Sequence, residues 1–254
     1  MVTTTPQNRN TSKLRYQEID ILRGIAALSM IAFHTTFIIQ TIFKKHISSS
    51  LLFWQGTPIL IGGTFIILAG LSLYIAVQKG KYSNPLVLLQ RSGSLFCLGI
   101  LITVSTYLLN IGGVVYFGIL HCIGLSTFIS FYLLSLPKYI LLVMGLLLIG
   151  IGMYWNFNQS LCLHTSLFWL YHCHCASLRP MLDYYPLVPW LGFMLVGIVL
   201  GKQYYPKGEC VFYLRIFSKV AFYTRPISFL GKHSLFIYCI HTPIIFIILY
   251  LILA

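Results

Sequence analysis

Charged side chains are scarce in this sequence. Only 8% of its 254 residues are Asp, Glu, Lys or Arg, and only four of these are acidic, whereas 58% of the chain is hydrophobic. Soluble domains carry about 25% charged residues. The composition therefore excludes a soluble globular domain and predicts an integral membrane protein in a lipid bilayer.

Several other signals are missing as well. The seven cysteines form no disulfide framework, and the run YHCHC (residues 171–175) has a spacing that fits neither a CxxC knuckle nor HExxH. We therefore predict no metal site and expect this loop to pack its own aromatic rings. The first apolar stretch is too long for a signal peptide and no small-residue cleavage site follows it, so we expect a retained first helix.

What the sequence does have is a series of apolar runs. Crossing a hydrocarbon core of about 30 Å takes about 20 apolar residues in a helix. The runs predict an all-α polytopic bundle in one transmembrane domain, residues 1–254, with a polar tail (1–18) and an external loop (156–185). The seven predicted spans cover about 22–43, 57–77, 93–111, 115–135, 138–155, 186–203 and 231–253.

An eighth membrane segment is left open. The stretch SLCLHTSLFWLYHCHC (160–175) is apolar enough to be re-entrant or interfacial. The short links NIGGV and LPK predict tight hairpins, so the helices on either side of each link should be antiparallel neighbours.

Basic residues concentrate on one side of the predicted topology, which places the N-terminus in the cytosol by the positive-inside rule. Lys44, Lys45 and Arg179 are the exceptions on the outer side. Topology alone accounts for much of the net charge of +13, and no nucleic-acid partner is predicted. The alternative is that a cytosolic polyanion, such as a phosphate-rich cofactor, docks on this face.

Polar residues inside the predicted spans are the strongest functional signal, because such residues are usually paired or functional. On the first helix Asp20, Arg23 and His34 fall on one face at helical spacing. On the last helix Ser234, Tyr238 and His241 share a face, and His121 lies in the fourth span. By helical rise, His34, His121 and His241 lie roughly 18, 21 and 12 Å from the cytosolic edge, which favours a shared site over isolated interhelical hydrogen bonds.

Histidines at such a site suit acyl transfer, because a neutral imidazole accepts a proton or carries an acyl group. A proton-coupled transporter of a small metabolite would use the same residue types. It normally has an intramembrane carboxylate and paired repeats, and the sequence has neither a central carboxylate nor a repeat. A structural or assembly subunit is the third class, and the polar residues along one groove argue against it.

Five blocks of this sequence resemble successive blocks of one family. The chain resembles the heparan-α-glucosaminide N-acetyltransferase catalytic-domain family and its short prokaryotic relatives. The resemblance implies a membrane acyltransferase that takes acetyl from cytosolic acetyl-CoA, and in the animal enzyme gives it to a terminal glucosamine. The blocks are IDILRGIAALSMIAFH (19–34), GGTFIILAGLSLYIA (62–76), YFGILHCIGLS (116–126), DYYPLVPWLGFMLVGIVLG (183–201) and LGKHSLFIYCIHTPII (230–245).

The resemblance leaves two histidines open as the acetyl-transferring residue. Its first-helix signature matches Asp20, Arg23 and Gly24, and His34 takes the polar position at the outer end. The animal member's proposed acetyl-carrying histidine lies in the external segment after that helix, where the nearest match is His46. The intervening residues do not resemble that segment, and we favour His34.

The remaining site predictions follow from this picture. The CoA phosphates are expected at Arg23, Arg91 and Lys232, with Asp20, Ser234 and Tyr238 completing the cofactor side. A sugar-type or amine acceptor on the outer side is expected to meet Asp183, Tyr184 and Trp190, which could equally belong to an interfacial aromatic belt. The plasma membrane of a prokaryote and a homodimer are predicted, and the identity of the acceptor stays open.

Overall fold

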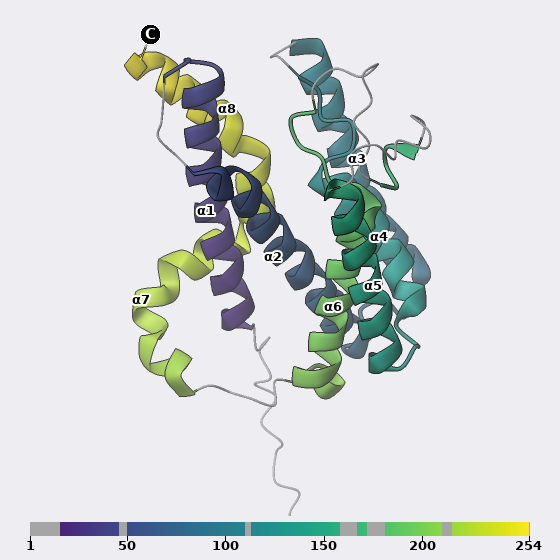
Figure 1. Ribbon diagram of the computed structural model, residues 1–254. Coiled ribbons are helices and arrows are strands. Elements are labelled where there is room, and N and C mark those ends of the chain that lie inside the picture. The colour runs from purple at the N-terminus through teal and green to yellow at the C-terminus, as the bar shows by residue number, and fades with distance from the viewer. Residues whose placement is uncertain are drawn as a thin grey trace, which may run out of the picture. The chain divides into compact units, whose positions relative to one another are not determined.

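The structure is a computed structural model that describes residues 16–45, 50–109, 113–157, 167–171, 181–209 and 215–253. These residues form eight α-helices and a 3-10 turn at Pro206–Gly208 (Figure 1). The helices are α1 (Gln17–Thr41), α2 (Leu51–Gln78), α3 (Pro85–Leu109), α4 (Ile119–Leu133), α5 (Lys138–Phe157), α6 (Leu187–Tyr204), α7 (Arg215–Lys232) and α8 (Ser234–Leu253).

The predicted class is confirmed: the described chain is all-helical and polytopic. Six helices, α1, α2, α3, α5, α6 and α8, are long and apolar enough to cross a membrane. The span predicted at 115–135 corresponds to α4, which has only 15 residues. At 1.5 Å per residue it is about 22 Å long, shorter than the hydrocarbon core.

Helix α7 was not predicted, because basic residues interrupt its apolar pattern and it contains no continuous apolar run. Its sequence RIFSKVAFYTRPISFLGK mixes apolar and basic residues along one amphipathic helix. The last predicted span, 231–253, therefore begins in the last residues of α7 and continues through the whole of α8, with His233 between the two helices. The possible membrane segment at 160–175 lies mostly outside the described residues.

The chain divides into two compact units. We call α1, α7 and α8 the terminal unit, and α2 to α6 the central unit, and describe each by itself. The prediction of a single transmembrane domain stays a prediction.

In the terminal unit, α7 and α8 both pack against α1 (Figure 1). Helices α1 and α7 approach closely at two glycines: a Cβ on Gly24 would overlap the Ile227 carbonyl, and one on Gly231 would overlap the Asp20 carbonyl. Helix α8 runs parallel to α1, since Ile38 packs with Ile245 and Phe43, just after the end of α1, lies near Phe246, further along α8.

In the central unit, α6 is the common packing partner of α2 and α5, which both lie along it (Figure 1). Glycines allow α2 to approach α6 closely: Gly70 faces the Met194 carbonyl, and Gly197 faces the Ile67 carbonyl. Leu195 of α6 is fully buried in the core of this unit.

One hairpin prediction is right and the other is wrong. Helix α4 packs against α3, as the NIGGV link predicted, whereas α5 packs along α6 instead of along α4. Lys202 of α6 contributes to this arrangement, because its Nζ donates to the carbonyls of Leu134 (2.8 Å) and Leu136 (2.7 Å) just after α4. A lysine at these carbonyls satisfies acceptors that the helix end leaves open.

Residues 113–118, before α4, are irregular rather than helical, and all of them except Tyr116 are buried. Val114 is 0% and Phe117 5% exposed. Buried irregular backbone needs its polar groups paired. The hydroxyl of Thr106 accepts from Val115 N–H (3.1 Å), while the carbonyls of Val114 and Phe117 accept from the backbone of Leu182 (3.3 Å) and Tyr185 (2.9 Å). This pairing fixes 113–118 beside 181–185 and so positions the start of α4.

Candidate functional site: two histidine environments

In the terminal unit, His34 of α1 and His241 of α8 are in direct contact. Nε2 of His241 lies 3.3 Å from Nδ1 of His34, and the ring centroids are 4.8 Å apart at 72°. His241 is 6% exposed, and His34 is half-buried. The parallel packing of α1 and α8 brings the two rings to the same level.

Backbone carbonyls fix which nitrogen of each ring carries the proton. Nδ1 of His34 lies 2.9 Å from the Met30 carbonyl, and Nδ1 of His241 lies 2.7 Å from the Tyr238 carbonyl. A carbonyl only accepts hydrogen bonds, so both Nδ1 atoms are donors, and in a neutral imidazole Nε2 then holds the lone pair.

The two lone pairs have different surroundings. Nε2 of His241 accepts from the Thr242 hydroxyl at 3.1 Å and faces the Nδ1 proton of His34. Within the described part of the chain, no hydrogen bond reaches Nε2 of His34. The lone pair on Nε2 of His34 is therefore available to act as a base or as a nucleophile. His241 contacts the other nitrogen of the same ring, Nδ1.

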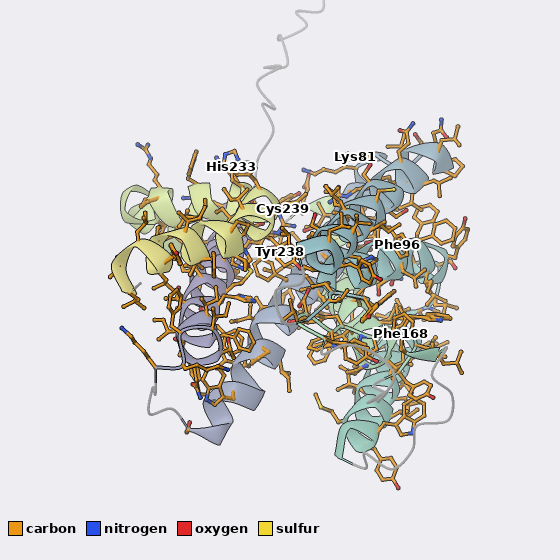
Figure 2. The ribbon with its side chains drawn as sticks, turned by 90° about the horizontal axis from the view of Figure 1, so that it is seen from above. Lys81, Phe96, Phe168, His233, Tyr238 and Cys239 are labelled. Carbon is orange, nitrogen blue, oxygen red and sulfur yellow. The ribbon has the colours of Figure 1, made fainter. Side chains whose placement is uncertain are left out.

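The predicted cofactor residues of this unit lie toward the start of α1 and of α8. Asp20 is 4% exposed, and its Oδ1 is 3.9 Å from Nη1 of Arg23. Lys232 is exposed at the end of α7. On α8, Ser234 is half-buried and the Tyr238 ring, labelled in Figure 2, has its centroid 5.8 Å from that of His241.

In the central unit, His121 is held in the opposite way. The backbone N–H of Gly118 donates to its Nδ1 at 3.3 Å, so in the neutral ring Nδ1 holds the lone pair and Nε2 the proton. The ring lies 5.4 Å from Phe117, stacked, and 5.1 Å from Phe96, edge-on, with Phe96 labelled in Figure 2. His121 is 3% exposed, and Gly99 leaves room for its ring.

Asp183 joins this second histidine environment. Its Oδ2 accepts from the Ile119 N–H at 3.1 Å, at the first turn of α4, and Gly118 has no Cβ that would collide with the carboxylate. A carboxylate at a helix N-terminus is favoured by the helix dipole and by the unpaired N–H groups there. Asp183 thus anchors 181–185 to the start of α4.

The aromatic residues after Asp183 make further contacts in the same unit. The hydroxyl of Tyr184 donates to the carbonyls of Phe168 (2.6 Å) and Tyr171 (2.9 Å). Tyr185 donates to the Pro58 carbonyl at 3.4 Å. Burial, with a contribution from the Asp183 charge, raises the pKa of Tyr185 well above its usual value, so it stays a donor. Trp190 is 8% exposed and packs 4.6 Å from the Tyr185 ring.

Within each unit the structure brings predicted site residues together. His34 and His241 meet, with Asp20, Arg23, Lys232, Ser234 and Tyr238 in the same unit. His121, Arg91, Asp183, Tyr184 and Trp190 belong to the central unit, where Arg91 is exposed on α3. A single site with all three histidines stays a prediction, and His46 lies outside the described residues.

In the run YHCHC, where we predicted packed aromatic rings and no metal site, only Tyr171 is described. Its ring packs against Trp155 of α5 at 5.3 Å. No group of three or more His, Cys, Asp or Glu side chains suited to a metal ion occurs within the described ranges.

Two contributors were not found from the sequence. Thr242 follows His241 directly, and the HTP triplet could have drawn attention to a hydroxyl beside the ring. Tyr185 lies between two predicted acceptor residues, and only the fold shows that its hydroxyl turns toward α2.

Comparison with known proteins agrees with these features. Residues 15–243 match the family model described as heparan-alpha-glucosaminide N-acetyltransferase, catalytic. No curated protein and no solved structure matches the sequence. The match covers α1 to the middle of α8 and includes both histidine environments. The chain belongs to the heparan-α-glucosaminide N-acetyltransferase catalytic-domain family, a family of membrane acyltransferases.

Proposed function

We propose that this integral membrane protein moves an acetyl group from cytosolic acetyl-CoA to an amine or hydroxyl of a sugar-type acceptor on the other side of the membrane. The family supports acyl transfer in general. One observation supports a role for histidine in this transfer. Nε2 of His34 has an available lone pair, while Nδ1 of the same ring contacts His241.

A lone pair on Nε2 of His34 serves either route of acetyl transfer. In one route Nε2 takes a proton from the acceptor while the acceptor attacks the acetyl carbon. In the other, Nε2 attacks that carbon itself, CoA leaves as the thiolate, and the acceptor then displaces the imidazole. In both, the CoA sulfur finally receives the proton that the acceptor loses.

On the donor side, we assign the anionic groups of CoA to Arg23 and Lys232 of the terminal unit, and Arg91 of the central unit remains a further candidate. Arginine binds phosphate through two parallel hydrogen bonds, and lysine acts as a point charge. Asp20 positions Arg23 through the ion pair between them. Ser234 and Tyr238 lie on the helix that carries His241 and provide hydroxyl donors for the thioester carbonyl.

On the acceptor side, Asp183 and Tyr184 are assigned to hydroxyl contacts and ring contact with a sugar. Trp190 supports them by packing behind Tyr185. The Nε2–H of His121 adds a hydrogen-bond donor. This ring is therefore suited to donate a hydrogen bond to an oxygen of the sugar rather than to remove a proton from it. We further propose the plasma membrane of a prokaryote, with the N-terminus in the cytosol, and a homodimer.

The test uses purified protein with [14C]acetyl-CoA and glucosamine as the probe acceptor. Label should move from CoA to the amine in the wild type and should be lost in His34→Ala. His233→Ala is the matched control, because His233 is exposed at the α7–α8 junction. His46→Ala should mainly raise the KM for the acceptor. Absence of turnover in the wild type contradicts acetyl transfer, and an inactive His46→Ala beside an active His34→Ala contradicts the assignment of His34.

A further inference from the structure

We propose that His241 is the proton-accepting partner of His34, so that the two rings work as a relay. The inference builds on the acetyl-transfer function proposed above and adds a residue role to it. It rests on three observations: the 3.3 Å contact from Nδ1 of His34 to Nε2 of His241, the lone pair on that Nε2, and the fixed orientation of the His241 ring.

The orientation of His241 comes from its own helix. Its Nδ1 proton is shared between the carbonyls of Tyr238 (2.7 Å) and Ile237 (3.2 Å). Both bonds hold the same edge of the ring against the preceding turn, so the opposite edge, with Nε2, must face α1. The Thr242 hydroxyl reaches the same atom and can rotate to accept from it when it is protonated.

The relay disposes of the charge that appears on His34 during transfer. When Nε2 of His34 bonds to the acetyl carbon and the C–S bond breaks, the ring becomes a cation that still carries a proton on Nδ1. That proton passes to Nε2 of His241: the N–H bond on His34 breaks and one on His241 forms. His34 is then a neutral acetylimidazole and His241 an imidazolium. The proton returns when the acetyl group leaves.

The Met30 carbonyl cannot perform this step. It accepts a hydrogen bond from the same Nδ1 at 2.9 Å and helps to choose the tautomer, but it is far too weak a base to take the proton. Acylation withdraws electrons from the imidazole ring and makes the Nδ1 proton acidic, which favours its transfer to the second imidazole. His241 therefore acts through His34: it orients that ring and accepts its Nδ1 proton, without touching the substrate itself.

The experiment compares three replacements of His241 in the purified full-length protein. Asn can accept a hydrogen bond but not a proton, Glu can accept both, and Ala can accept neither. Each variant is treated with diethyl pyrocarbonate, which acylates imidazole nitrogen without needing CoA, and modification of His34 is timed by mass spectrometry. Turnover of acetyl-CoA with glucosamine is measured in parallel, with His233→Asn as the control.

The relay predicts that His241→Asn and His241→Ala each slow both the acylation of His34 and the turnover of acetyl-CoA by about 100-fold, the usual scale of acid–base catalysis. His241→Glu should recover most of the lost rate in both reactions. In all three variants the KM for acetyl-CoA should stay unchanged. Acylation of His34 at the wild-type rate in His241→Asn overturns the relay, and so does failure of Glu to exceed Ala in variants that bind acetyl-CoA normally. If the acylation series holds while wild-type turnover is absent, the relay stands and the acetyl-transfer proposal fails.

Discussion

The two histidine environments of this protein expose opposite edges of the same side chain. His34 donates from Nδ1 to a carbonyl and leaves a lone pair on Nε2, whereas His121 accepts at Nδ1 from a backbone N–H and leaves a proton on Nε2. One ring is therefore suited to attack or to take up a proton, and the other to donate a hydrogen bond.

The difference follows from where each residue stands on its helix. His34 lies in the interior of α1, where the carbonyl four residues earlier is within reach of Nδ1. His121 lies in the first turn of α4, where N–H groups have no partner within the helix and a side-chain acceptor is favoured. The position in the helix thus selects the tautomer, and the tautomer selects the chemistry.

The largest effect should separate the two histidines by activity. Removal of the reactive nitrogen in His34→Ala should lower kcat by at least about 100-fold, as for loss of a general base. His121→Ala removes a single donor and should cost about tenfold, in line with one hydrogen bond to a polar group. Steady-state turnover of the two purified variants measures this, and a larger loss in His121→Ala would reverse the comparison.

A smaller effect is expected on stability in the terminal unit. Gly24→Ala places a methyl group against the Ile227 backbone carbonyl, and overpacking of this kind costs about 1–3 kcal/mol. Because α7 must shift away from α1, thermal unfolding in detergent should begin at a lower temperature.

The matched control for Gly24→Ala is Gly150→Ala on α5, where nothing lies within 4 Å of the added Cβ. It should stay within about 0.5 kcal/mol of the wild type. Equal behaviour of the two variants would mean that α1 and α7 do not pack closely.

The smallest effect concerns the anchor that orients His121. Asp183→Ala leaves the Ile119 N–H without its acceptor and should destabilise the protein by about 1 kcal/mol, as for loss of a helix N-cap. Asp183→Asn keeps an acceptor oxygen and should retain most of that stability. Unfolding midpoints of the two variants provide the measurement, and an Asn variant as unstable as Ala would argue against a capping role.

Periodicity and composition were enough to predict most helices, because a lipid-spanning helix must be apolar over its whole length. They were not enough for α7, where basic residues interrupt the apolar pattern, or for α4, whose preceding residues are apolar but not helical. The residues Asp20, His34 and His241 could be chosen because polar groups in lipid are rare. Which nitrogen of His34 and of His241 carries the proton could not be predicted. It depends on the Met30 and Tyr238 carbonyls and on the contact between two helices that are distant in sequence.

The most direct test of the account is the protonation of the two rings in solution. With 15N-labelled histidine in the protein in detergent micelles, long-range 1H–15N correlation spectra distinguish the Nδ1–H from the Nε2–H tautomer, and His34→Gln and His121→Gln assign the signals. We predict Nδ1–H for His34 and Nε2–H for His121 at a pH where both rings are neutral. An Nε2–H tautomer at His34 would contradict it, because the nitrogen assigned to acetyl transfer would then have no lone pair.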